Sequence, residues 1–281
     1  MDTRFRAVVG LVRAAHPGPT IAVTTVATLL AYAGGRSGGG LLAVAAAVGT
    51  GQLSVGWSND AHDAPVDIRA ERTDKPIVAG EVVSRVVWCA AGAALTATAV
   101  LSVVAAGWFG GTLHLAAVGL AWAYNLRISR TGWSFVPYVL AFALLPAFIT
   151  YASEPPSPPA AWVVVGFAAM GLGAHLLNGL RDLDVDRRSG LDGAVVRTGA
   201  RRGRLLAALA FVVAGAAVGV GLRDARPLLA VAVPVVSVAV LVPTVWLAPP
   251  RWAFRAVLVA AVGLVLVLVS AALAGELAIT A

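Results

Sequence analysis

The chain has 281 residues, of which 59% are hydrophobic and only 12% are charged, and its mean hydropathy is +0.85. An ordinary soluble domain is about 45–50% apolar and 25% charged, so the composition excludes a soluble enzyme and indicates an integral membrane protein. Twenty-one basic residues against 14 acidic ones give a net charge of +7. With Cys89 as its single cysteine, the chain has neither a disulfide framework nor a cysteine-ligated metal site.

Nine segments are apolar enough, and at roughly 20 residues long enough, to cross a bilayer as helices. They are expected near residues 18–34, 40–57, 83–106, 109–125, 134–152, 160–178, 204–222, 227–247 and 253–275. These segments use most of the chain and leave no room for a soluble domain. The sequence therefore predicts an all-α membrane bundle of nine transmembrane helices, forming a single domain over residues 1–281.

Basic residues mark one face of this predicted bundle. The N-terminus and the loops after the second, fourth, sixth and eighth segments hold 18 of the 21 Lys and Arg residues. Because loops rich in Lys and Arg stay in the cytoplasm, these loops and the N-terminus are predicted to be cytoplasmic, with the C-terminus outside. The excess of Arg over Lys is typical of GC-rich bacterial genomes, so a bacterial cytoplasmic membrane is expected. Topology accounts for the basic charge, and no nucleic-acid partner is expected.

Acidic residues gather in two short segments, between Asp60 and Glu81 and between Asp182 and Asp192, which together hold ten of the 14. Each segment carries an asparagine and two aspartates at four-residue spacing: Asn59, Asp63 and Asp67, then Asn178, Asp182 and Asp186. Residues four apart share a helix face, so each segment predicts a polar stripe at the cytoplasmic end of a crossing. Two such stripes, four crossings apart, indicate two pseudo-repeats with acidic motifs near 59–67 and 178–186.

A divalent cation explains why carboxylates gather in this way. Aspartates four residues apart repel one another, and ionised groups near a bilayer are costly unless they are hydrated or paired. Mg²⁺ takes oxygen ligands, typically one or two carboxylates together with substrate phosphates and waters. Two facing stripes that hold Mg²⁺, with Arg and Lys close behind, predict a site where metal and cations stabilise a leaving pyrophosphate.

The two motifs resemble those of a known family. The pattern Asn59-Asp60-x-x-Asp63-x-x-x-Asp67, followed by Arg72-x-x-Lys75-Pro76-Ile77, is similar to the first signature of the UbiA-type intramembrane prenyltransferase superfamily. The pattern Asn178-x-x-Arg181-Asp182-x-x-x-Asp186 is similar to the second. The resemblance implies a helical bundle around a central cavity and a Mg²⁺–polyprenyl diphosphate at its cytoplasmic mouth. It also implies an enzyme that transfers the prenyl group to an acceptor, often aromatic.

The same resemblance implies roles for individual residues. The metal ligands it implies are Asn59, Asp60, Asp63, Asn178, Asp182 and Asp186, with Asp60 in a supporting position. The carboxylates it places at the reaction are Asp63, Asp67, Asp182 and Asp186. The substrate-binding residues it implies are Arg72, Lys75, Tyr124, Arg127, Arg130 and Arg181.

A third family element, a tyrosine followed by a lysine after the fourth crossing, is only partly present. Tyr124 is there, but Ser129 stands near the position where a lysine is expected, so Arg127 or Arg130 is expected to supply the charge. His175 precedes Asn178 by three residues on the same helix face. It either lines the cavity or packs between helices.

Two other functions fit parts of the pattern. A terpene cyclase would use the same metal site and let the chain's own double bond capture the carbocation. A divalent-cation or metabolite transporter would place its acids near the bilayer midplane, whereas both clusters here lie at one interface. The sequence therefore favours prenyl transfer, and it leaves the donor chain length and the acceptor open.

Overall fold

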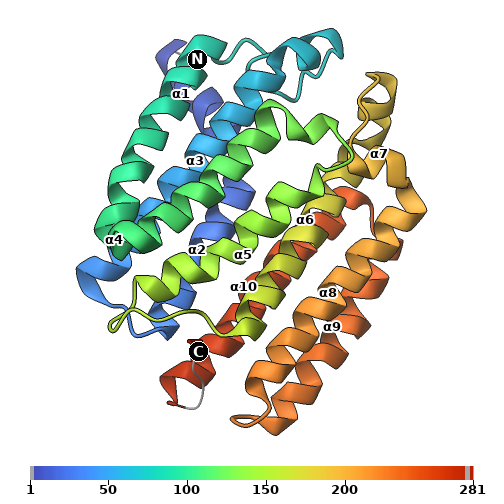
Figure 1. Cartoon of the computed structure of the whole chain (residues 1–281). Helices are drawn as coiled ribbons and strands as arrows, with labels where there is room; N and C mark the ends of the chain where they lie inside the picture. Colours follow the sequence, from blue (N-terminus) through green and yellow to red (C-terminus); the bar gives the residue numbers. More distant parts are fainter. Residues whose placement is uncertain (1–2, 276–278, 281) are drawn as a thin grey trace.

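The computed structural model describes residues 3–275 and 279–280, which form a bundle of helices running side by side (Figure 1). The α-helices in order are α1 (Thr3–Ala14), α2 (Pro17–Ala33), α3 (Gly38–Arg69), α4 (Ser84–Leu126), α5 (Phe135–Tyr151), α6 (Ala161–Arg188), α7 (Ala194–Thr198), α8 (Ala200–Leu222), α9 (Pro227–Leu247) and α10 (Pro250–Leu273). A short 3-10 helix, η1 (Ile128–Arg130), follows α4. The all-α prediction is confirmed.

Six helices within the described residues are long and apolar enough to cross a membrane: α3, α4, α6, α8, α9 and α10. The helices α2 and α5, with 17 residues each, coincide with the predicted segments 18–34 and 134–152 but are shorter than those six. Large apolar side chains on α9 remain exposed on the outside of the bundle, including Leu228 and Val231. Such an apolar exterior is what a lipid environment requires.

The helix α4 contains two of the predicted segments, 83–106 and 109–125, with a reversal between them. Gly107 has φ 64° and ψ −174°, a non-helical conformation that glycine adopts without strain. Ser102 Oγ lies 2.7 Å from His114 Nδ1, although twelve residues of straight helix would separate them by about 18 Å. The two halves of α4 therefore lie antiparallel to each other.

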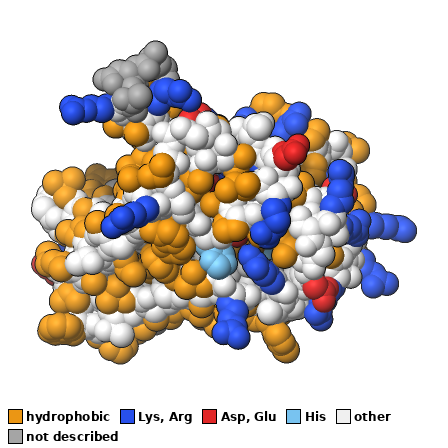
Figure 2. Space-filling view, turned by 90° about the horizontal axis from the view of Figure 1, so that it is seen from above, with side chains coloured by type: hydrophobic (Ala, Val, Ile, Leu, Met, Phe, Trp, Pro, Cys, Tyr) orange, Lys and Arg blue, Asp and Glu red, His pale blue; other side chains and the backbone are white. Residues whose placement is uncertain are grey.

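The polar ends of α3 and α6 lie at the same end of the bundle, near α1 and α7 (Figure 1). Both helices continue past their predicted apolar segments, α3 as far as Arg69 and α6 as far as Arg188. Figure 2 looks onto this end and shows many Lys and Arg side chains, with only a few acidic ones visible between them. The fold thus brings the two acidic segments to one face.

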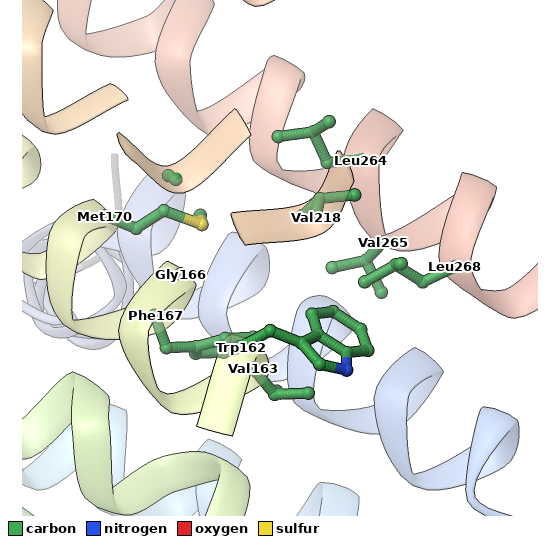
Figure 3. Close-up of a pocket in the computed structure, with 10 residues that line it drawn as sticks. Trp162, Val163, Gly166, Phe167, Met170, Val218, Leu264, Val265 and Leu268 are labelled. Carbon is green, nitrogen blue, oxygen red and sulfur yellow. The ribbon is translucent and has the colours of Figure 1, made fainter. Parts of the chain in front are cut away.

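A small apolar pocket lies between α6, α8 and α10 (Figure 3). Its lining includes Trp162, Met170 and Leu264. Met170 is the lining residue of α6 nearest to the polar end, and it precedes Asn178 by eight residues, or about 12 Å of helix. The pocket is therefore separate from the acidic segments.

A close contact between Gly56 and the turn after α1 positions the start of the chain beside α3. A Cβ at Gly56 would lie 2.5 Å from the carbonyl oxygen of Ala15. Trp57 Nε1 donates a hydrogen bond of 2.8 Å to the Leu11 carbonyl in the same region. Only a residue without a side chain permits this approach of backbone to helix.

Gly56→Ala is therefore expected to destabilise the protein by about 1–3 kcal/mol, because α1 and the turn must move to admit the methyl group. The thermal unfolding midpoint in detergent measures this effect. Gly92→Ala in α4 is the matched control, since a Cβ there meets nothing within 4 Å. Equal midpoints for the two variants would show that the contact is not needed.

Candidate active site

Both acidic segments lie on helices, as predicted from their spacing. Asn59, Asp63 and Asp67 belong to α3, and the equivalent asparagine and aspartates of the second segment belong to α6. Residues four apart on one helix share a face, so each set forms a stripe. Asp184 falls off its stripe and is exposed.

Arg72 brings the two stripes together. It lies in the loop after α3, and its Nη1 is 3.8 Å from Asp67 Oδ1 and 3.4 Å from Asp182 Oδ1. Asp67 and Asp182 come from different motifs on different helices, and Asp182 is 110 residues from Arg72 in the sequence. The two motifs therefore form one site.

Ion pairs stabilise the charged side chains of the loop that contains Arg72. Burial works against the charged guanidinium, but the hydrogen bond to Asp74 and the charges of Asp182 and Asp67 raise the pKa of Arg72 above its usual value. Although burial acts in the opposite direction, the same hydrogen bond and charge lower the pKa of Asp74. Arg13 of α1 pairs with Glu81 and donates to the Asp74 carbonyl at 2.7 Å. The N-terminal helix thus binds the loop at two points, Asp74 and Glu81.

Lys75 pairs with two carboxylates of the first motif. Its Nζ lies 2.8 Å from Asp60 Oδ1 and 3.8 Å from Asp67 Oδ2. Asp60 is only 2% exposed, and within the described residues its other oxygen, Oδ2, is buried without a hydrogen-bond partner. A buried carboxylate oxygen without a partner is costly, and it offers a hard oxygen ligand for a cation.

His16 is a neighbour of this carboxylate that the sequence did not reveal. Its Nε2 lies 3.7 Å from Asp60 Oδ1. Burial and the nearby Lys75 ammonium together lower the pKa of His16 to about 4. The ring is therefore neutral at pH 7 and adds no charge to the site.

Asn125 is a second residue of the site that was not predicted. It is buried, and its Nδ2 donates hydrogen bonds of 2.9 Å to the Val55 carbonyl and to Ser58 Oγ. Its Oδ1 is 3.5 Å from Asn59 Nδ2, which also donates to Asp63 Oδ2 at 3.1 Å. An amide at the end of an apolar segment was the only available signal, and it does not identify the partner helix.

Asn125→Ala is expected to lower activity about 10–100-fold, the usual cost of removing a partner that orients a metal-site residue. The loss should appear as a higher Mg²⁺ requirement of the reaction, because Asn59 and Asp63 lose their fixed orientation. Leu126→Ala, at the exposed neighbouring position, is the control. An unchanged Mg²⁺ requirement in the Asn125 variant would show that this contact serves packing alone.

Electrostatic interactions join the remaining carboxylates. Asp186 interacts with Asp182, Asp63 and Asp67, and with the Arg72 guanidinium. Four acids in one electrostatic environment need cations for balance. No group of three His, Cys, Asp or Glu side chains within the described residues is close enough to hold a metal ion alone. A metal here would need ligands from a bound phosphate and water, which is how Mg²⁺ commonly binds.

The predicted substrate-binding arginines differ in how they contact the acidic residues of the site. Arg181 Nη2 lies 3.0 Å from Asp182 Oδ2, and Arg130 interacts electrostatically with Asp63. Arg127 is exposed and caps the end of α4. Of the two arginines predicted to replace the missing lysine, Arg130 is therefore the one that the described contacts connect to the acids.

Aromatic rings lie next to the acids on the apolar side. Tyr124 interacts electrostatically with Asp186, Asp63 and Asp182. Its ring meets Tyr138 edge-on at 5.0 Å between centroids. The site thus combines carboxylates and cations with two neighbouring tyrosine rings.

The chain is an integral membrane protein with one site, rich in acid and arginine, at the polar end of its apolar helices. Residues 20–256 match the UbiA prenyltransferase family. The protein belongs to that family and is an enzyme of the prenyltransferase class, which confirms the resemblance of the motifs.

Solved structures share the fold. A UbiA homolog from Archaeoglobus fulgidus bound to GPP and Mg²⁺ has a TM-score of 0.70 and 16% identity, with 94% of this chain and 98% of that chain covered. A UbiA homolog from Aeropyrum pernix K1 has a TM-score of 0.69 and 16% identity, over 92% and 97%. A digeranylgeranylglyceryl phosphate synthase has a TM-score of 0.65 and 12% identity, over 98% and 99%. No curated protein matches the sequence.

Proposed function

We propose that the protein transfers a prenyl group from a Mg²⁺-bound polyprenyl diphosphate to an acceptor, aromatic in our proposal, within the membrane. The observation that carries this proposal is the bridge of Arg72 between Asp67 and Asp182, because it joins both acidic motifs and a cation in one site. The UbiA homolog bound to GPP and Mg²⁺ supports the same pairing of metal and prenyl diphosphate.

The oxygen-bearing side chains of the site suit a magnesium ion. The residues proposed to hold it are Asn59, Asp60, Asp63, Asn178, Asp182 and Asp186. The buried Asp60 oxygen that has no hydrogen-bond partner among the described residues supports this choice. When bound, Mg²⁺ supplies Lewis-acid stabilisation of the charge that develops on the leaving pyrophosphate.

The cations of the site would exchange partners when the substrate binds. Arg72 and Lys75 pair with carboxylates of the site. We propose that a diphosphate draws both toward its own oxygens, with Arg130 and Arg181 beside them. Charged hydrogen bonds to phosphate are strong and directional, especially from arginine.

The bond from C1 of the prenyl chain to oxygen then breaks, and pyrophosphate leaves. Tyr124 and Tyr138 lie on the apolar side of the acids, where their rings would stabilise an allylic carbocation by cation–π attraction. The apolar bundle keeps water away from the cation. The acceptor attacks the carbocation, a new bond to C1 forms, and the acceptor loses a proton.

We also propose the membrane arrangement. Nine crossings are supplied by α2, α3, the two halves of α4, α5, α6, α8, α9 and α10. The N-terminus and the site loops face the cytoplasm of a bacterium, the C-terminus lies outside, and residues 1–281 form one domain of two pseudo-repeats. Cysteines introduced at Asp184 and Asp224, with Cys89 replaced, should react from opposite sides of the membrane. Labelling of both from one side would contradict this arrangement.

Product analysis tests the reaction. The purified protein in nanodiscs is incubated with Mg²⁺, with prenyl diphosphates of several chain lengths, and with 4-hydroxybenzoate, a dihydroxynaphthoate or glycerol phosphate. Mass spectrometry should detect a prenylated acceptor. A cyclic hydrocarbon or alcohol from donor alone would indicate a cyclase instead. No Mg²⁺-dependent product from any donor would contradict the proposed function.

A further inference from the structure

His175 is a buried histidine on the apolar side of the acids. It is 3% exposed, and its ring lies 5.1 Å from the ring of Tyr138 and 5.8 Å from that of Tyr124. Both tyrosines adjoin the site, since Tyr124 interacts with acids of both motifs and Tyr138 interacts with Arg181 and Asp182. His175 therefore forms a cluster of three rings with Tyr124 and Tyr138, next to the carboxylates.

Ser134 is the hydrogen-bond partner of His175. Ser134 is 1% exposed, and its Oγ accepts a hydrogen bond of 3.0 Å from the Ala194 backbone N–H. The Ser134 hydroxyl still has its own proton to donate, and in the described chain the acceptor beside it is His175 Nε2, at 3.3 Å. With the hydroxyl donating to Nε2, the neutral ring carries its proton on Nδ1.

This Nδ1–H group has no partner in the described part of the chain, although it is buried. Buried polar groups in proteins are nearly always hydrogen-bonded, and leaving one unpaired costs free energy. The partner that the chain does not supply is therefore expected from a molecule bound in the site.

The position of His175 along α6 indicates which bound molecule supplies this partner. His175 precedes Asp182 by seven residues, so the two share a face of α6 and lie roughly 10 Å apart along the helix. The metal-bound diphosphate would fill the space next to the carboxylates. His175 lies below it, at the level where the prenyl C1 is released and the acceptor must approach.

We propose that His175 binds the acceptor, with Nδ1–H donating a hydrogen bond to a hydroxyl, carbonyl or carboxylate oxygen of that molecule. The inference rests on the proposed function and adds that the acceptor bears oxygen and lies beside the Tyr124 and Tyr138 rings. An electron-rich oxygenated ring satisfies both contacts. The donor diphosphate needs no contact with His175.

The test compares acceptor use with donor binding. His175→Phe keeps a ring of similar size but cannot donate, whereas His175→Asn keeps an N–H near the position of Nδ1. The acceptor is whichever of 4-hydroxybenzoate, the dihydroxynaphthoate and glycerol phosphate the wild-type protein prenylates fastest. The KM for that acceptor should rise at least about tenfold in His175→Phe, with partial recovery in His175→Asn. Mg²⁺-dependent binding of a prenyl thiolodiphosphate should stay within about twofold in both variants.

Two further variants separate this role from packing. His114→Phe is the matched control, because His114 is equally buried but its Nδ1 already contacts Ser102, and its acceptor KM should not change. Ser134→Ala should raise the acceptor KM without altering donor binding, which keeps the test decisive if His175→Phe does not fold. An unchanged acceptor KM in the folded His175 and Ser134 variants would overturn this inference but not the proposed function. Absence of donor binding or of any prenylated probe in the wild-type protein would overturn the proposed function as well.

Discussion

Asp182→Asn is expected to lower Mg²⁺-dependent pyrophosphate release from a prenyl diphosphate by at least about 10²–10³-fold, the usual cost of losing one electrostatic group at a reaction centre. Asp182 is the carboxylate that links the motifs, with Arg72 Nη1 at 3.4 Å and Arg181 Nη2 at 3.0 Å. Asparagine keeps the size of the side chain but removes the negative charge that the metal requires. The measurement is kcat/KM for pyrophosphate release in nanodiscs.

Asp184→Asn is the matched control for this prediction. It is the same substitution two residues further along α6, at an exposed position off the stripe. Its kcat/KM should stay within about twofold of wild type. If both variants kept full activity, the second motif would have no role in the metal site.

Arg72→Lys is expected to lower kcat/KM by about 10–100-fold, mainly through a higher KM for the diphosphate. Arg72 reaches Asp67, Asp74 and Asp182 together, which uses the planar fork of the guanidinium. A lysine ammonium is a compact point charge that cannot hold several partners in this geometry. Steady-state kinetics at saturating Mg²⁺ separate the change in KM from any change in kcat.

Arg69→Lys provides the comparison for Arg72. Arg69 is exposed in the last turn of α3, three residues before Arg72, and its replacement should leave both constants unchanged. Equal kinetics for the two variants would show that a general positive potential, rather than the fixed position of Arg72, supports the reaction.

The stripes were predictable because local spacing determines them. Four-residue spacing places Asn59, Asp63 and Asp67 on one face of any helix, and the same holds for the second motif. The structure confirms both helices. The break at Gly107 also falls between the predicted apolar segments 83–106 and 109–125.

Long-range contacts could not be predicted in this way. Asn125 meets Asn59 across 66 residues, and His16 meets Asp60 through the turn between α1 and α2. Neither contact leaves a periodic signal, because helix packing alone brings those side chains together. The sequence likewise does not separate Arg130 from Arg127, because the interaction of Arg130 with Asp63 connects η1 to α3.

The most direct test of the account is the binding of a non-reactive prenyl thiolodiphosphate to the protein in nanodiscs, with and without Mg²⁺. If both motifs form one metal–diphosphate site, the wild-type protein should bind the analogue only when Mg²⁺ is present. Asp63→Asn in the first motif and Asp182→Asn in the second should each weaken that binding at least about tenfold. Equal binding without Mg²⁺, or unchanged binding in both variants, would contradict the account.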